Sequence, residues 1–300
     1  MQENTPFPLA FLVYKPQRRL KLGDVYKSKP QLAIDLIEDL QARGFRFDVV
    51  LADCLYGESD AFTATLERLG LHYVVALRSY QRIWMGPGER KRYPRWRTFD
   101  RVFADGTSAP RFIREVIFGT RARHRCRYYQ ITTDKERQPQ ATTWLVATNL
   151  PGKIERTVGD TYGWRTWIED GFKQSKDELG WADYRVTDYA AIERWWEIVM
   201  SAALLVSLQR PALASRLPVA SGGTDASVEA AAAAPLSAHP QWDGGPGWKR
   251  TLNNLRLIVQ PYVCACLLLP WRHLVPLPHL QEGLADLCRL MNTFRPLFPT

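Results

Sequence analysis

The sequence predicts an α/β fold, and three observations carry this prediction. Strand-like and helical segments alternate over the first 78 residues, a β-rich and strongly basic region follows, and helical periodicity returns near residue 160. Alternation of this kind is typical of a sheet with helices packed on it. The chain has 300 residues, which is enough for one large domain or two smaller ones with a sizeable core.

The first 78 residues supply the alternating elements. Apolar residues at helical spacing, opened by a proline or a serine and followed by glycine, predict the helices. Short apolar runs without polar alternation predict strands in a sheet that is covered on both faces. In chain order the elements are a strand at Leu9–Tyr14, a helix at Pro30–Arg43, a buried strand at Asp48–Ala52 that delivers Asp53, a helix at Ser59–Leu69 and a strand at His72–Leu77.

Residues 79–159 have a different pattern. Gly, Pro, Arg and aromatic residues alternate there with strand-like runs, namely Phe112–Phe118, Arg127–Thr132 and Thr143–Ala147, so we expect a β-rich insertion into the α/β domain. From Arg78 to Arg137 there are 16 basic and 6 acidic residues, a net charge of +10, against 24 and 25 in the remainder of the chain. An excess of this size favours an anionic partner, either nucleic acid or a membrane surface.

Aromatic residues lie between the basic ones in this region. They are Trp84, Tyr93, Trp96, Tyr128 and Tyr129. Basic residues mixed with aromatic rings suit neutralisation of phosphates together with stacking on bases, which favours DNA as the partner. The alternative is that the arginines form a solvated face of a β-domain.

The remainder of the chain predicts helices and a linker. We expect core helices over 160–210, a flexible linker over 211–247 because of its Ala, Gly, Ser and Pro content, and a helical segment over 248–300 broken at its prolines. The apolar runs Ile198–Leu208 and Tyr262–Trp271 are too short to span a bilayer, so they predict buried helices. The expected divisions are thus 1–78, 79–159, 160–210, 211–247 and 248–300.

The cysteines exclude some classes of site. Their number, five, is odd, and no two have the CxxC spacing, which argues against a disulfide framework and against a zinc site. The first residues show no basic stretch followed by an apolar one, so no signal peptide is predicted. We therefore expect a cytoplasmic protein.

The segment that carries chemistry is Tyr162–Lys176. Tyr162, Arg165, Glu169 and Lys176 lie at offsets 0, 3, 7 and 14, which on one helix places all four side chains on a narrow face. Such a face suits a site that holds a metal ion through Glu169 and phosphate through the two cations. A structural ladder of ion pairs is the alternative, and for Lys173 on the same helix solvation and DNA contact are equally expected.

These residues resemble a known signature. Their spacing matches the Y-(2)-R-(3)-E-(6)-K pattern of IS4-type DNA transposases at all four positions, and the stretches Leu51–Gly57, Trp167–Lys176 and Leu179–Asp183 resemble the IS701-like branch. The resemblance implies an RNase H-like catalytic core with a β-rich insertion and a helical C-terminal region. It implies metal-dependent DNA strand cleavage and transfer by an insertion sequence, with Asp53 and Glu169 as catalytic metal ligands and Tyr162, Arg165, Lys173 and Lys176 as phosphate-binding residues.

The resemblance also implies the cofactor and the completeness of the site. In that family two Asp and one Glu bind two divalent ions, Mg²⁺ or Mn²⁺, and Asp53 and Glu169 resemble the second and third acids. The first acid lies on an earlier strand, and no Asp precedes Leu9–Tyr14 here. We therefore expect that the chain begins inside the catalytic domain, lacks the family's DNA-recognition region and is inactive alone.

The expected partners are double-stranded DNA at the element's ends and a second copy or a full-length transposase, with no membrane, in a nucleoid-associated cytoplasmic protein. Two other functions remain open. One is a non-catalytic DNA-binding or regulatory truncated transposase. The other is a metal-dependent nuclease of another class that uses Asp53, Glu169 and Lys176.

Overall fold

The computed structural model divides the chain into two compact units, Leu9–Glu197 and a smaller one made of Met1–Pro8 and Ile198–Thr300. The structure describes residues 7–78, 83, 85, 87–103, 107–119, 125–152, 155–214, 239–245, 247–268, 270, 279, 282–283 and 286.

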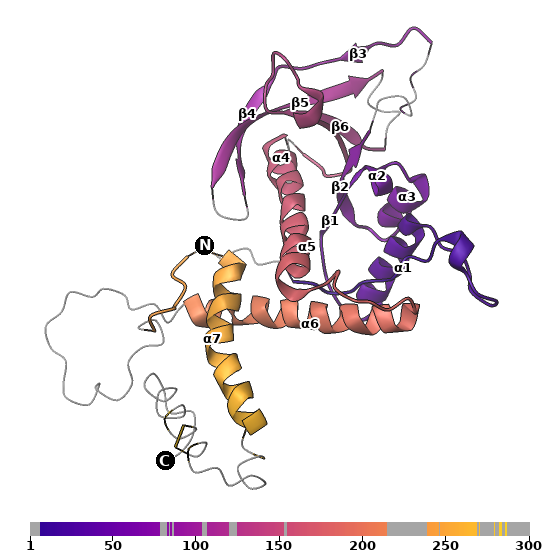
Figure 1. Cartoon of the computed structure of the whole chain (residues 1–300). Coiled ribbons are helices and arrows are strands. Elements are labelled where there is room, and N and C mark those ends of the chain that lie inside the picture. Colours follow the sequence, from indigo (N-terminus) through magenta and orange to yellow (C-terminus); the bar gives the residue numbers. More distant parts are fainter. Residues whose placement is uncertain are drawn as a thin grey trace, which may run out of the picture. The chain divides into compact units, whose positions relative to one another are not determined.

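The larger unit contains a seven-stranded mixed sheet (Figure 1). Its strands are β1 (Val49–Ala52), β2 (His72–Leu77), β3 (Lys91–Arg92), β4 (Arg97–Val102), β5 (Ser108–Phe118), β6 (Arg127–Thr132) and β7 (Thr143–Thr148). Their order is β1-β2-β7-β6-β5-β3, and β4 pairs with β5. β1 and β2 are parallel, and every other pair is antiparallel. The mixed α/β class predicted from the sequence is confirmed.

The basic β-rich region continues this sheet. β7 pairs with β2 from Val74↔Thr148 to Leu77↔Leu145, so the last strand of the region returns beside the strand after which it began. The strands predicted at Arg127–Thr132 and Thr143–Ala147 are confirmed, and the one at Phe112–Phe118 lies within the longer β5. Whether residues 79–159 act as a separate domain stays a prediction.

The helices are α1 (Lys29–Ala42), α2 (Cys54–Gly57), α3 (Asp60–Arg68), α4 (Glu155–Gly163), α5 (Arg165–Leu179), α6 (Tyr189–Ala214) and α7 (Gly247–Leu268), with short 3₁₀ turns at Gln17–Arg19 and Gln140–Thr142. The sequence predicted α1 and α3 within one residue at each end, because their starts are capped. Ser28 forms a capping box with Gln31, and Ser59 accepts a hydrogen bond from the Phe62 N–H.

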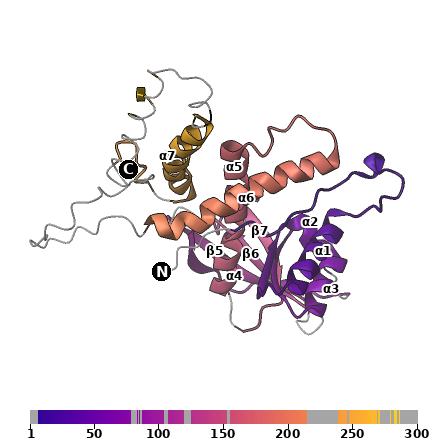
Figure 2. The ribbon, with the colours of Figure 1, turned by 90° about the horizontal axis from the view of Figure 1, so that it is seen from below.

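Helices cover both faces of the sheet (Figure 2). On one face, α1 and α3 pack against alternate residues of the strands, including Tyr73, Val75 and Ala147. On the other face, α4 packs Val158 and Tyr162 against Val74, Ala76, Val146, Phe99 and residues of β5 and β6. A Cβ added at Gly159 would lie 2.6 Å from the Phe99 ring, so only glycine lets α4 approach β4 this closely.

The strand predicted at Leu9–Tyr14 is absent. This stretch has no regular secondary structure, and Phe11 instead packs edge-on against Trp196 with ring centroids 6.0 Å apart. An apolar run becomes a strand only when a neighbouring strand pairs with its backbone, and no described strand pairs here.

The smaller unit is built around α7 and the part of α6 that follows Glu197. The Trp248 indole donates to Ser207 Oγ at 3.1 Å, and the buried Asn254 side chain bonds the backbone of Asp243 in both directions. The linker predicted over 211–247 overlaps α6, which continues through Pro211 to Ala214. α7 also continues through Pro261, where a break was expected. Residues 215–238 and most of 269–300 lie outside the described residues.

The run Ile198–Leu208 lies in α6, and the second run lies in α7 as far as Leu268, but these helices are not fully buried as expected. Ile198, Leu205 and Leu208 of α6 and Tyr262, Val263 and Leu267 of α7 are exposed in this chain. No helix in the described part of the chain is long and apolar enough to cross a membrane.

Candidate functional site

The segment from Tyr162 to Lys176 spans two helices rather than the single helix that was predicted. α4 ends at Gly163 and α5 begins at Arg165. Trp164, between them, keeps a helical backbone, with φ −63° and ψ −19°, and its N–H donates to the Thr161 carbonyl at 3.1 Å. The break is therefore a tightened turn, and α5 follows α4 closely in direction (Figure 1).

Arg165 and Glu169 form the central contact of this segment. Their side chains make an ion pair at 2.7 Å across one turn of α5, with Glu169 52% exposed. The Arg165 guanidinium carbon also lies 5.8 Å from the centre of the Tyr162 ring. The glutamate is thus accessible from solvent while a cation fixes its orientation.

The other members of the motif divide into one buried and two exposed residues. Tyr162 is buried in the core under α4, and burial raises the pKa of its phenol. It therefore supports Arg165 from beneath. The sequence predicted Tyr162 on an open phosphate-binding face, and the structure places its side chain in the core instead. Lys173 and Lys176 are exposed on α5, with Lys176 two helical turns beyond Glu169.

Asp53 ends β1 and begins α2. Its Oδ1 accepts a hydrogen bond from the Leu55 N–H at 2.9 Å, so the side chain caps the short helix. α2 lies very close to β2, because a Cβ added at Gly57 would be 2.2 Å from the Ala76 carbonyl oxygen. This packing holds Asp53 at the carboxyl end of a parallel strand, where sites in α/β sheets commonly form.

The end of β1 packs in the same hydrophobic cluster as α4. Cys54, next to Asp53, packs against the cluster that contains Tyr162 and Val158 of α4. The helix that leads into α5 therefore shares a core with the end of β1. The distance between the two carboxylates was expected to be short, and it stays a prediction.

The two carboxylates suit a divalent ion. Carboxylate oxygens are the hard ligands that Mg²⁺ and Mn²⁺ prefer. The recorded contacts of Asp53 and Glu169, with Leu55 and Arg165, each engage one oxygen of the group. Among the described residues no group of three or more His, Cys, Asp or Glu side chains is placed to hold a metal ion. Asp53 and Glu169 would thus be part of a ligand set.

Two arginines beside α5 were missed by sequence reasoning. Arg101 of β4 donates from Nη2 to Thr166 Oγ1 of α5 at 2.7 Å, and its stem lies over Gly163. Burial, followed by the nearby Arg111, lowers the pKa of the Arg101 guanidinium. The sequence showed the basic charge of this region. It did not show the strand register, which determines which arginines lie near α5.

The aromatic residues of the basic region have mixed positions. Tyr129 is buried, so the expectation that it stacks on bases is wrong. Tyr128 is half-buried and packs against two core clusters, and its stacking on bases stays a prediction. Tyr93 and Trp96 hold Arg114 between them, at 4.3 and 4.2 Å from its guanidinium carbon to the ring centres. Trp84 lies outside the described residues.

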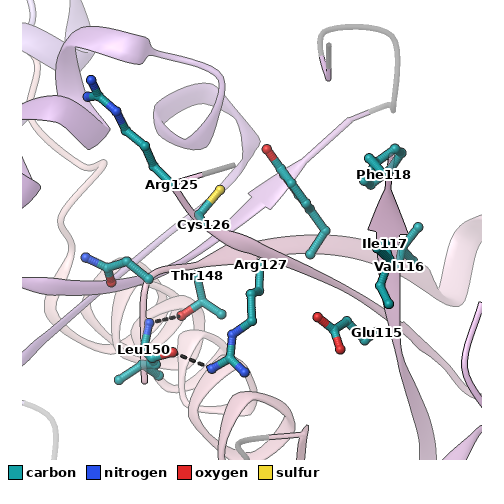
Figure 3. Close-up of a pocket in the computed structure, with 11 residues that line it drawn as sticks. Glu115, Val116, Ile117, Phe118, Arg125, Cys126, Arg127, Thr148 and Leu150 are labelled. Carbon is teal, nitrogen blue, oxygen red and sulfur yellow. Dashed lines mark hydrogen bonds between the residues drawn. The ribbon is translucent and has the colours of Figure 1, made fainter. Parts of the chain in front are cut away.

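A separate pocket of about 290 Å³ lies against β5, β6 and the end of β7 (Figure 3). Its Arg127 donates to the carbonyl oxygens of Leu150 and Gly152, so this guanidinium holds the turn after β7. β7 runs antiparallel to β2, which is itself parallel to β1. The end of β7 therefore lies at the opposite end of the strands from Asp53, which follows β1. The pocket is not part of the site around Asp53.

Parts of the chain are similar to known proteins. Residues 14–135 match the family model described as DDE superfamily endonuclease, a range that includes Asp53, Arg101 and Arg111 but ends before Glu169. A probable transposase for insertion sequence element IS701 from Microchaete diplosiphon is 50% identical over 188 residues, which are 62% of this chain and 49% of that protein. The chain thus spans about half the length of this curated relative. The resemblance predicted from the sequence is confirmed: over these parts of its length the chain is similar to the DDE superfamily endonucleases and to this probable IS701 transposase.

Proposed function

We propose that this chain carries the metal-dependent DNA cleavage and strand-transfer site of an IS701-like DDE transposase, on an RNase H-like core. The observation that carries the proposal is the exposed Glu169, which Arg165 holds on α5. The preceding helix, α4, packs in the same hydrophobic cluster as Cys54, the residue next to Asp53. The likeness to a probable IS701 transposase supports the same function.

In this proposal Asp53 and Glu169 hold the divalent ion. When bound, Mg²⁺ or Mn²⁺ supplies positive charge for the attacking and leaving oxygens of a displacement at phosphorus. Arg165 orients the Glu169 carboxylate and faces phosphate, while Tyr162 supports Arg165 from the core. Lys173 and Lys176 extend the cationic face of α5 along the DNA backbone.

In this proposal the metal site is incomplete, because these 300 residues lack one of its three carboxylates. Two carboxylates are present where the resemblance implies three, and the described residues provide no third metal-binding group beside them. A missing ligand weakens Mg²⁺ binding, since this ion needs near-ideal octahedral geometry. We therefore propose that the chain alone binds double-stranded DNA without cleaving it. Its protein partner would be a second copy or a full-length transposase. The protein would be cytoplasmic and associated with the nucleoid.

Mn²⁺ titration followed by calorimetry tests the metal site. Asp53→Asn and Glu169→Gln should each abolish binding. Asp170→Asn is the matched control, because Asp170 is an exposed carboxylate beside Glu169 on the same helix but points away from Arg165. Mn²⁺ binding that survives both site substitutions would overturn the assignment of ligands.

A cleavage assay with Mg²⁺ on DNA that carries the element's ends tests the incomplete site. The chain alone should leave the DNA intact. Cleavage that is lost in Glu169→Ala would show that the site is complete and that this part of the proposal is wrong.

A regulatory DNA-binding role is the second candidate. The net charge of +10 over residues 78–137 favours it, because DNA binding by this charge requires no metal. The two candidates differ in one measurement. If the chain binds DNA in EDTA and lowers the cleavage rate of a full-length homologue in a mixed assay, without binding Mn²⁺ itself, the regulatory role is the better description.

A further inference from the structure

Three arginines from three different elements form a series that ends at the first turn of α5, with Arg101 next to both of the others. Arg165 begins the helix, Arg101 reaches Thr166 from β4, and Arg111 extends from β5 on the same face of the sheet. Arg101 and Arg111 both lie against the ring of Phe103, with guanidinium carbons 5.2 and 5.9 Å from its centre. We call Arg101, Arg111 and Arg165 the arginine cluster.

The register of the β4–β5 hairpin produces this arrangement. Arg101 pairs with Ala109, and Arg111 pairs with Phe99, whose ring is buried under α4. Residues two apart on a strand share a face, so Arg101 lies on the same side as Phe99. Arg111 lies on that side too, because directly paired residues point the same way. The Arg101 side chain lies where α4 gives way to α5, and Arg111 shares with it this face of the sheet and the contact with Phe103.

The cluster has more positive charge than its described surroundings balance. Arg165 pairs with Glu169, while the pKa of Arg101 is lowered by burial and by the proximity of Arg111. The Nε atoms of Arg101 and Arg111 are buried without a hydrogen-bond partner among the described residues. A buried donor without an acceptor is costly, and more so when it carries charge. Donors arranged in this way suit an anion.

We propose that the arginine cluster binds a phosphodiester group of DNA directly beside Glu169. Guanidinium groups present several N–H donors in a planar fork that matches phosphate oxygens, and the Phe103 ring limits water on one side of both forks. The group bound here lies next to the carboxylate assigned to the metal. The cluster therefore positions the strand on which that site acts, and Arg101 and Arg111 are positioning residues.

The identification of the phosphate as DNA rests on the proposed function, whereas the anion site itself does not. The test is therefore made in EDTA, where no metal-dependent step contributes. Failure of DNA cleavage or of Mn²⁺ binding then leaves the result of this test unaffected.

The experiment measures the affinity for a short labelled duplex by fluorescence anisotropy over a series of salt concentrations. Arg101→Gln and Arg111→Gln should each weaken binding and lower the slope of log K against log salt by about 0.9, the value for one lost phosphate contact. Arg43→Gln is the control for charge alone, since Arg43 is exposed at the end of α1, which covers the other face of the sheet, and pairs with Asp39. This variant should keep the wild-type slope.

Two further measurements separate an effect on folding from an effect on binding, and DNA from free phosphate as the ligand. If Arg101→Gln lowers the melting temperature strongly, Arg111→Gln decides, because Arg111 makes no hydrogen bond to α5 among the described contacts. Inorganic phosphate should raise the melting temperature of the wild type more than that of Arg111→Gln. Stabilisation by phosphate with unchanged DNA binding in the variants would overturn the DNA assignment, and wild-type behaviour in both measurements would overturn the site.

Discussion

Arg165 and Glu169 form an ion pair of 2.7 Å on the first turn of α5, and the next residue after Arg165, Thr166, accepts a hydrogen bond from Arg101 of β4. Because the Glu169 side chain is 52% exposed, this pair contributes little to folding, at most about 1 kcal/mol. Its value lies in fixing the glutamate. We expect Arg165→Gln to leave the melting temperature nearly unchanged and to weaken DNA binding severalfold.

Arg165→Lys is the matched variant for this prediction. Lysine keeps the charge but loses the planar fork, so its DNA affinity should fall between those of the wild type and Arg165→Gln. Thermal melting and anisotropy titration measure the two effects. A large loss of stability with unchanged DNA affinity would show that Arg165 is a structural residue.

Asp53 has a structural role that can be separated from the proposed metal role. Its carboxylate caps α2 by accepting the Leu55 N–H, and an asparagine side chain accepts the same bond. Asp53→Asn should therefore retain stability while it loses Mn²⁺ binding. Asp53→Ala should lose both, with a cost of about 0.5–2 kcal/mol in the free energy of unfolding for the missing cap. Urea unfolding and calorimetry of the two variants check this, and equal stabilities would contradict the capping role.

Gly57 sets the distance between α2 and β2. A Cβ at this position would lie 2.2 Å from the Ala76 carbonyl oxygen and 3.0 Å from Val75 Cβ, and both belong to a buried strand. Gly57→Ala should therefore displace α2, destabilise the fold by about 1–3 kcal/mol and weaken metal binding through Asp53.

Gly171 is the control for this substitution. It lies inside α5, and a Cβ there would meet no atom within 4 Å. Gly171→Ala should stabilise the chain by up to about 1 kcal/mol, because alanine favours a helix interior. Urea unfolding compares the two variants, and a neutral Gly57→Ala would mean that α2 can shift without cost.

The sequence predicted elements well where local signals are strong. Capping serines and flanking glycines indicated the limits of α1 and α3, and short strand-like runs indicated β2, β6 and β7. The strand prediction for Leu9–Tyr14 was wrong because apolar composition is a local property, whereas strand formation depends on a pairing partner elsewhere in the chain. The helix break at Gly163 and Trp164 was also missed, since it is a tightened turn that leaves the apolar spacing nearly intact.

The site was predicted only in part, for a similar reason. The spaced motif identified Arg165 and Glu169 because both lie one turn apart on the same helix. Arg101 and Arg111 could not be distinguished from the other arginines of the basic region. Their approach to α5 depends on the β4–β5 register, which is a property of the folded sheet. The same limit applies to Tyr128 and Tyr129, whose burial depends on which face of β6 is covered.

Alkaline pH should unfold this protein through its buried tyrosines. Burial, followed by the nearby Cys126, raises the phenol pKa of both Tyr73 and Tyr128 above the ordinary value of 10.0. A folded-state pKa above the unfolded one means that the neutral phenol contributes stability that is fully present below about pH 10 and is lost as the pH rises further. The free energy of unfolding should therefore be nearly level from about pH 7 to 8 and decline steeply above about pH 10.

Tyr73→Phe tests the origin of this decline. The variant loses the hydrogen bond from the Tyr73 hydroxyl to Glu67, so its stability at pH 8 should be lower by about 1 kcal/mol. Its decline above pH 10 should nevertheless be shallower, because one buried group no longer ionises on unfolding.

Burial also raises the pKa of the Cys126 thiol, which adds to the decline in the wild type and the variant alike. Tyr93→Phe is the control, since the Tyr93 ring is exposed and should leave the slope unchanged. Urea unfolding at each pH measures the three proteins, and parallel declines in all of them would show that the buried phenols are not the cause.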